Sequence, residues 1–506
     1  MHSSRMARRS ARILIVPLML AGMIGTASPA IGSMASPGAR GAAEAGTAVV
    51  VKQMISDFES NCALLTSGKV YCWGYGLSGE LGDGKSVASG TPVAVVRTSG
   101  TGALSGVASL ASDGQGVCAV LASGGVDCWG YGGEGELGNG NFAGSNKPVA
   151  VKGVGGKGTL TGVASIAPYH AFGGSAGYCA LLISGRVDCW GFGPYGQLGD
   201  GKFYTTGNEG SAVPVAVKGL RGSGTLTGVA SLYSTGGNGF TTYCARLTTG
   251  GVDCWGHGFY GQLGDGVNYP TNQGSDVPVA VKGIGGKGIL PGVASLRDGF
   301  NAFCAVRTSG AADCWGWDFG QLGDGSSSQP QANVPVAVKG VGGSGTLSGV
   351  ASLSSADQES FCAALTSHQA ACWGSIANAY PTPVTGVSGS GRLTGVASIA
   401  ATTFVAGNTF CARVTTGGAD CWGNGFQGEL GNGSTNSTVL TPVKVSGTGG
   451  SGHLAGVAAI TGSQGDGNFC AVLGSGKADC WGFGNDGELG NGASINSDIP
   501  VAVRLP

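Results

Sequence analysis

The sixteen cysteines are the residues of this chain whose type and spacing point most directly to chemistry. They form eight pairs with nine residues between the two members, and Trp-Gly follows the second cysteine of every pair. A fixed spacing that leaves no cysteine over predicts disulfide bonds, which persist in oxidising compartments. The predicted pairs are Cys62–Cys72, Cys118–Cys128, Cys179–Cys189, Cys244–Cys254, Cys304–Cys314, Cys362–Cys372, Cys411–Cys421 and Cys470–Cys480.

Two alternatives for the cysteines are metal ligation and buried reduced thiols. Zinc ligands usually come in close pairs with about two to four residues between them. A spacing of nine residues does not match that pattern. The sequence therefore favours disulfides and predicts no metal site.

Histidines and catalytic motifs give little support for an active site. His170, His257, His368 and His453 fall at non-equivalent positions of the repeat, so we expect solvated loop histidines and no shared central site. No nucleophile elbow, phosphate loop or dinucleotide motif appears in a suitable context. The sequence therefore predicts no catalytic residue and no cofactor.

The acidic residues recur in register with the repeat. Asp and Asn exchange freely within a Leu-Gly-Asp-Gly or Leu-Gly-Asn-Gly segment, as at Asp83 and Asn139. Asx side chains between glycines cap turns through their own backbone. A second Asp precedes the second cysteine in six copies, which favours an architectural role over the alternative of calcium binding.

The cysteines need hairpins to position them. The first pair is symmetric about Ser67, so two strands folding back there would place Cys62 opposite Cys72. Cross-strand neighbours lie about 4.5–5.5 Å apart, within the reach of a disulfide. Each copy contains four short apolar runs bounded by Gly, Ser, Asn and Pro, which indicates strands and turns.

Four strands in each of eight copies predict an all-β fold, a β-propeller. We expect the Trp after each second cysteine to pack between blades. The sixth copy is degenerate, because no Leu-Gly-Asp-Gly turn follows Cys372-Trp373-Gly374. Eight blades are favoured, and a seven-bladed ring is the alternative.

The pattern resembles the regulator of chromosome condensation (RCC1-like) repeat family over residues 47–506, in the form found in secreted bacterial members. The resemblance implies an RCC1-like propeller that binds proteins through its loops. No copy here has the Gly-Asp-x-His motif common at the family's functional positions. This argues against guanine-nucleotide exchange.

The N-terminal segment predicts export. Residues 1–35 read as a signal peptide, with four arginines before a short apolar stretch, and residues 36–46 as a disordered lead-in before the 47–506 propeller. The apolar stretch is too short for a spanning helix. Lys and Arg number 27 against 28 Asp and Glu, and losing residues 1–35 removes four Arg, leaving 23 against 28. The acidic balance argues against nucleic acid or an anionic membrane as partner.

The segment before each first cysteine varies most between copies. We expect these segments to be loops that share one face and form an aromatic rim suited to binding. The candidate binding residues are Tyr169, His170, Phe172, Tyr233, Phe240, Phe300 and Phe404. Loops after the Leu-Gly-Asp-Gly turn, with Phe203, Tyr204 and Tyr269, are a second candidate surface, and Trp317 receives no role.

The leading functional hypothesis is a secreted, disulfide-stabilised, monomeric propeller that binds an extracellular protein without catalysis, in an inhibitor-like manner. Alternatives are an exported carbohydrate-active enzyme or glycan-binding protein, and a structural component of the cell surface or envelope. A pocket with two carboxylates about 5–10 Å apart would favour the enzyme.

Overall fold

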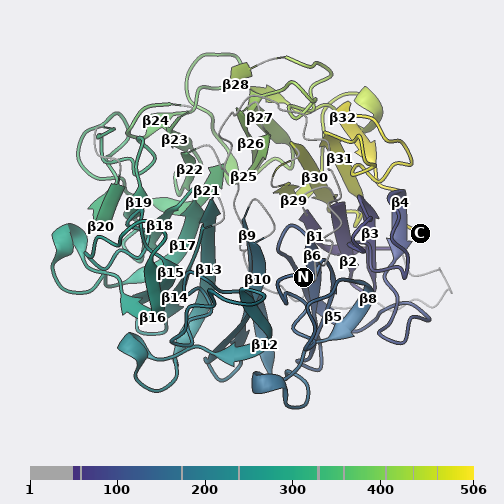
Figure 1. The fold of residues 1–506 in the computed structure, drawn as a ribbon. Coiled ribbons are helices and arrows are strands. Elements are labelled where there is room, and N and C mark those ends of the chain that lie inside the picture. The colour runs from purple at the N-terminus through teal and green to yellow at the C-terminus, as the bar shows by residue number, and fades with distance from the viewer. Residues whose placement is uncertain are drawn as a thin grey trace, which may run out of the picture.

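A computed structural model of the chain describes residues 49–56, 60–171, 175–237, 240–327, 331–356, 359–375, 377–404, 407–436, 438–463, 465 and 467–506. The predicted signal peptide and lead-in lie outside these residues. Eight four-stranded antiparallel sheets form a ring of blades (Figure 1). Each blade consists of four consecutive strands and therefore of one repeat, which confirms the prediction of an eight-bladed all-β propeller.

The strands of the first four blades pair in chain order. Blade 1 has β1 (Val51–Ser56), β2 (Ser60–Leu65), β3 (Val70–Gly74) and β4 (Ser89–Ala94); blade 2 has β5 (Val107–Ser112), β6 (Gly116–Leu121), β7 (Val126–Gly130) and β8 (Ser145–Ala150). Blade 3 has β9 (Val163–Ala171), β10 (Ser175–Leu182), β11 (Val187–Phe192) and β12 (Gly210–Ala216); blade 4 has β13 (Val229–Gly237), β14 (Phe240–Leu247), β15 (Val252–His257) and β16 (Gly274–Ala280).

The last four blades repeat this order. Blade 5 has β17 (Val293–Gly299), β18 (Ala302–Arg307), β19 (Ala312–Trp317) and β20 (Gln331–Ala337); blade 6 has β21 (Val350–Ala356), β22 (Ser360–Leu365), β23 (Ala370–Gly374) and β24 (Thr382–Pro383). Blade 7 has β25 (Val396–Phe404), β26 (Gly407–Val414), β27 (Ala419–Asn424) and β28 (Thr438–Lys444); blade 8 has β29 (Val457–Gly462), β30 (Asn468–Leu473), β31 (Ala478–Gly482) and β32 (Ser497–Ala502).

Helical structure within the described ranges is confined to four short 3-10 turns, in linkers between blades. They are η1 (Val154–Gly156), η2 (Leu220–Gly222), η3 (Ile284–Gly286) and η4 (Thr448–Gly450). None of the described helices has the length and apolar character needed to cross a bilayer.

The ring closes between the first and last blades. The first strand of each blade lies toward the centre and contacts the first strand of the next, and β29 contacts β1 in the same way (Figure 1). At this seam the backbone N–H of Val51 donates to the carbonyl of Gly476 at 2.9 Å. The first and last blades are therefore each complete four-stranded sheets, and the ring closes by contact between them.

All eight predicted disulfides are present, and every cysteine is used. In each blade the two cysteines are direct cross-strand partners on the second and third strands, as Cys62 and Cys72 are on β2 and β3. Their Cα atoms lie 4.0–4.1 Å apart. The alternatives of metal ligation and reduced thiols are therefore wrong for this structure.

A tryptophan at the same position of every repeat lies between its blade and the preceding one. In seven blades the indole N–H donates to a backbone carbonyl in the loop after the third strand of the preceding blade, as Trp255 does to Gln197 at 3.0 Å. The donors are Trp73, Trp129, Trp190, Trp255, Trp315, Trp373 and Trp481. The prediction that the tryptophans pack between blades is confirmed.

Trp422 is the exception among the described residues. It faces blade 6, whose third strand is not followed by the Leu-Gly-Asp-Gly turn and whose fourth strand is only two residues long. Trp422 is 2% exposed, so its packing is retained, while its indole N–H has no hydrogen bond to any described residue of blade 6.

This exception provides a matched test of the hydrogen bond. Replacing Trp255 with Phe will cost about 1–3 kcal/mol more in the free energy of unfolding than replacing Trp422 with Phe, because only the first change leaves a buried carbonyl unpaired. Chemical denaturation of both variants, followed by intrinsic fluorescence, measures this difference. Equal losses would show that packing alone joins the blades.

Candidate functional site

One end of the ring carries the variable segments. Strands alternate in direction within a blade, so the connections from first to second strand and from third to fourth strand emerge at the same end. We call this end the loop face. The candidate binding residues predicted from the sequence belong to the first of these two connections.

Several segments expected to be loops are extensions of strands. The first strand is nine residues long in β9, β13 and β25, compared with six in β1, β5 and β29. Pairing continues to the tip, where Gly237 lies opposite Phe240 and Phe404 opposite Gly407. The expectation of loops is therefore wrong here, and blades 3, 4 and 7 carry longer inner hairpins.

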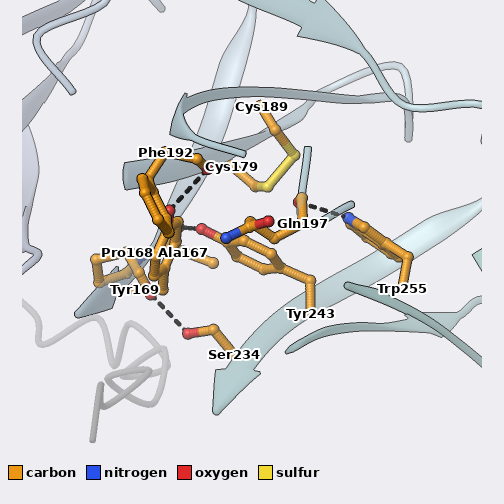
Figure 2. The surroundings of a disulfide bond; sticks show 10 residues. All are labelled: Ala167, Pro168, Tyr169, Cys179, Cys189, Phe192, Gln197, Ser234, Tyr243 and Trp255. Atoms are coloured by element: carbon orange, nitrogen blue, oxygen red, sulfur yellow. Dashed lines mark hydrogen bonds between the residues drawn. A yellow bond between two sulfur atoms is a disulfide. The ribbon is translucent and has the colours of Figure 1, made fainter. Parts of the chain in front are cut away.

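Tyr169 lies in the core between blades 3 and 4. Its side chain is 1% exposed, and its hydroxyl donates to the carbonyl of Phe192 at 2.8 Å. Figure 2 shows this ring beside that of Tyr243, which it meets edge-on with centroids 5.6 Å apart. Ser234 donates from its hydroxyl to the carbonyl of Pro168 at 2.6 Å (Figure 2). Tyr169 thus supports the base of the hairpins and offers no accessible surface.

The other candidate residues differ in how far their side chains are exposed to solvent. Phe240 and Tyr233 are half-buried, whereas Phe300 is 9% exposed. Phe172 lies outside the described residues, and of His170 and Phe404 only the strand positions are described. On the second candidate surface, Phe203 is 46% exposed, while the hydroxyls of Tyr204 and Tyr269 donate to the turn residues Asp200 and Asp265.

The loop face brings together nine rings from blades 3, 4 and 5, which we call the aromatic band. Each ring contacts at least one other, with centroids 4.3–6.4 Å apart. Its members are Phe192, Tyr195, Phe240, His257, Phe259, Tyr260, Phe300, Trp317 and Phe319. Only Phe240 and Phe300 were among the predicted binding residues.

The rings of the band mostly meet edge to face. Tyr195 crosses Phe240 at 63° with centroids 5.3 Å apart, and Tyr260 crosses Trp317 at 82° with centroids 4.3 Å apart. Phe319 is 50% exposed, and Tyr195, Phe259, Tyr260 and Trp317 are half-buried. The band therefore includes one exposed ring and four half-buried rings.

His257 forms the floor of the band, at the end of β15. It is 0% exposed, stacks on Phe240 with ring centroids 4.3 Å apart, and contacts the side chain of Gln262 through Nδ1 at 3.0 Å. Burial lowers its pKa to about 3, so the ring is neutral near neutral pH. The expectation of a solvated loop histidine is wrong for His257, because the preceding strand delivers it beneath aromatic neighbours.

The signal that sequence reasoning missed is the residue after Cys-Trp-Gly. It is aromatic or His in six of the eight copies, and in blades 3, 4 and 5 it is Phe192, His257 and Trp317. These residues end or follow the third strand, where the next turn adds Tyr195, the Phe259-Tyr260 pair and Phe319. An alignment of the copies at that position places Trp317 with Phe192 and His257 and so indicates that it belongs to the same surface.

Carboxylates flank the band at both ends. Beside Tyr195, burial and the charge of Glu209 raise the pKa of Glu134 and also that of the Tyr195 hydroxyl. At the other end the Trp317 indole N–H donates to Oε1 of Glu359 at 3.1 Å, and burial raises the pKa of this carboxyl. Glu209 is exposed, and Glu134 and Glu359 are half-buried.

The recurring acidic residues have structural roles. In the turns, an Asx side chain accepts from the backbone N–H two residues on, as Asp83 does from Lys85 at 2.9 Å and Asn139 from Asn141 at 2.9 Å. The Asp before the second cysteine is buried in all six copies that have it. Among the described residues, no group of three or more His, Cys, Asp or Glu could hold a metal ion.

Comparisons of the sequence find relatives among repeat proteins. No family model matches the chain. The human E3 ubiquitin-protein ligase HERC2 is 28% identical over 284 residues, which are 56% of this chain and 5% of HERC2. The ultraviolet-B receptor UVR8 of Arabidopsis thaliana is 30% identical over 275 residues, which are 54% of this chain and 55% of UVR8. The chain thus matches a small part of the first relative and about half of the second.

Solved structures share the fold. Yeast RCC1 (Prp20), determined bound to Kap60, aligns with a TM-score of 0.50 and 15% identity over 95% of this chain and 91% of that one. Human WBSCR16 aligns with a TM-score of 0.50 and 16% identity over 85% of this chain and 92% of that one. At these identities the likeness shows a shared fold.

Proposed function

We propose that this chain, an eight-bladed β-propeller of RCC1-like repeats, is a secreted, non-catalytic protein-binding module that acts through the aromatic band. The proposal rests on one observation: nine rings from three adjacent blades form a connected, partly exposed surface on the loop face. Aromatic side chains supply much of the energy in protein interfaces. Yeast RCC1 (Prp20), which shares the fold, is itself found bound to another protein, Kap60.

The band belongs to three blades, whereas the architecture belongs to all eight. The residue before the Gly-Gln-Leu-Gly segment is Tyr195, Tyr260 or Phe319 in these three blades, whereas the same position carries Ser78, Glu134, Gln427 and Asp486 in blades 1, 2, 7 and 8. A residue needed for the propeller itself would recur in every blade, as the buried Trp does. The difference between blades therefore supports a binding role.

The scaffold holds the band before a partner arrives. Cross-strand disulfides join β10 to β11, β14 to β15 and β18 to β19, the strands that end beneath the rings. A surface ordered in advance loses less conformational entropy on binding. Such a surface suits tight binding, including an inhibitor-like role in which the loop face covers a partner's working surface.

Burial supports binding over catalysis. The carboxyls of Asp113 and Glu136 interact electrostatically, but each residue is 1% exposed and thus closed to a substrate. His257, the histidine of the band, is neutral and 0% exposed. Neither of these two features offers an accessible acid–base pair of the kind that a glycosidase needs, so the enzyme alternative would depend on the more accessible carboxylates Glu134 and Glu209 beside the band.

Export is supported by the cysteines and by the predicted signal peptide. All sixteen cysteines are paired in disulfides, which persist mainly outside the cytosol. Residues 1–35, outside the described part, have the sequence pattern of a secretory signal. The proposed partner is therefore an extracellular or envelope protein.

Two phenylalanines provide a matched test of the band. Phe319 and Phe426 are 50% and 51% exposed and both follow the third strand of their blade, but only Phe319 belongs to the band. In a capture experiment with extracellular extract of the source organism, Phe319→Ala and Tyr260→Ala will each weaken binding of a discrete protein by roughly 30-fold or more, as expected for aromatic hot spots. Phe426→Ala will leave binding unchanged.

Affinities are then measured by titrating the identified protein against each variant, with melting curves as the control for folding. Equal affinity of Phe319→Ala and the parent would rule out the band as the binding surface. Capture of a glycan in place of a protein would support the glycan-binding alternative and contradict the proposal.

A further inference from the structure

We infer that the aromatic band binds a protein segment that carries Lys or Arg side chains. This inference deepens the proposed function and rests on it. Carboxylates lie at both ends of the band, its rings mostly meet edge to face, and the cations of the described ion pairs lie elsewhere.

The band is bordered by negative charge that has no ion-pair partner among the described residues. Glu134 and Glu209 come from adjacent blades at the Tyr195 end, and Glu359 lies at the Trp317 end. All three ion pairs in the described part of the chain lie elsewhere, at Lys85–Asp83, Lys202–Asp200 and Arg307–Asp313. The flanking carboxylates are therefore available to a cation from outside.

Two of these carboxylates come from adjacent blades and lie near each other. Burial is the main cause that raises the pKa of Glu134, and repulsion by the charge of Glu209 adds to it. Glu209 is held there with a φ of 56°, in the left-handed region that a non-glycine residue rarely adopts. An ammonium or guanidinium group placed between the two carboxylates would remove the repulsion.

The other end offers both a ring and a carboxylate. Trp317 donates to Glu359 at 3.1 Å, so a guanidinium that lies on the exposed part of the indole comes within reach of that carboxylate. Tryptophan is the best cation–π partner, and Arg is the cation that most often uses it. This pairing selects a basic side chain over a neutral one.

The ring angles favour side chains over a sugar. The neighbouring ring pairs Tyr195–Phe240, Phe259–Tyr260 and Tyr260–Trp317 cross at 63°, 66° and 82°, so these rings do not form an extended flat platform for stacking a pyranose ring. A segment with basic residues at its ends and apolar residues between them matches the carboxylate–aromatic–carboxylate order of the surface.

A constrained peptide library tests the inference without knowledge of the natural partner. Phage displaying random disulfide-closed heptapeptides are selected on the oxidised chain, and the enriched peptides are synthesised. We expect them to contain Lys or Arg beside an aromatic or aliphatic residue. Removing one carboxylate, by Glu209→Gln or Glu359→Gln, will weaken their binding roughly 3- to 10-fold, and raising the salt concentration will also weaken it.

Asp486→Asn is the matched control, because it removes one carboxylate from the corresponding loop of blade 8. Peptides that lack basic residues, or whose affinity is unchanged by Glu209→Gln and Glu359→Gln yet falls in Phe319→Ala, would overturn the cationic occupant and leave the proposed function standing. Peptides indifferent to Phe319→Ala as well would overturn both.

Discussion

Reduction of the eight disulfides will abolish cooperative folding of this chain. Each bond closes a loop of ten residues' separation, and such a loop contributes about 2–3 kcal/mol in the chain-entropy description. Even part of the total stabilisation from the eight disulfides would approach the free energy of unfolding of a typical protein, which is roughly 5–15 kcal/mol. The chain is also rich in glycine, at 102 of 506 residues, which raises the entropy lost on folding.

Circular dichroism and calorimetry can compare the thermal unfolding of the reduced, alkylated protein with that of the oxidised protein. Removing a single bond, as Cys62→Ala with Cys72→Ala, will lower the free energy of unfolding by about 2–3 kcal/mol without loss of the fold. A reduced protein that melts at the same temperature as the oxidised one would contradict the expectation. The blades would then be held by packing and by the tryptophan hydrogen bonds.

Replacing Gly199 with alanine will destabilise the junction between blades 3 and 4 by about 2–5 kcal/mol, from strain and steric overlap together. Gly199 has a φ of 66°, and a Cβ there would lie 2.8 Å from Nε1 of Trp255 and 2.9 Å from Cγ1 of Val217. Both contacts are buried, so neither neighbour can move into solvent. The change acts on the same junction as the Trp255 hydrogen bond.

Gly158→Ala separates strain from overlap. Gly158 has a φ of 64°, but a Cβ there would meet nothing within 4 Å, so only backbone strain of about 1–2 kcal/mol is expected. Denaturant titrations of the two variants should therefore differ clearly. Similar losses would show that the close approach of glycine to tryptophan does not set the spacing between blades.

The repeat architecture could be predicted from the sequence because each blade is encoded locally. The nine-residue spacing of each cysteine pair fixes a hairpin and its register, and eight copies fix the number of blades. Even the degenerate sixth copy keeps the hairpin of Cys362 and Cys372, which is why it still forms a blade. Trp373 remains in register for the same reason.

The binding surface could be predicted only in part, because its neighbours come from different blades. Phe240 contacts His257 within blade 4 and Tyr195 from blade 3, and Tyr260 contacts Trp317 from blade 5. Spacing within one copy says nothing about such pairs. Tyr169 had the residue type expected of a binding loop, but the added length of β9 placed it inside the core.

The sequence predicts loops where the structure has longer hairpins, for a related reason. Small residues and glycines such as Gly236 and Gly237 indicate turns, yet here they pair across the hairpin as far as its tip. This pairing extends β13 and β14 to the tip of the hairpin, where Phe240 contacts Tyr195. The pairing between strands, and not the local sequence, decides the position of Phe240.

Site-specific photo-crosslinking tests most directly whether the aromatic band is the surface that binds a partner protein. The benzophenone amino acid p-benzoylphenylalanine replaces Phe319 in one variant and Phe426 in another, since the two positions are equally exposed and differ in membership of the band. Each oxidised variant is irradiated in extracellular extract of the source organism. We expect one discrete protein adduct from position 319 and none from position 426. The same adduct from both positions, or an adduct from position 426 alone, would contradict this expectation.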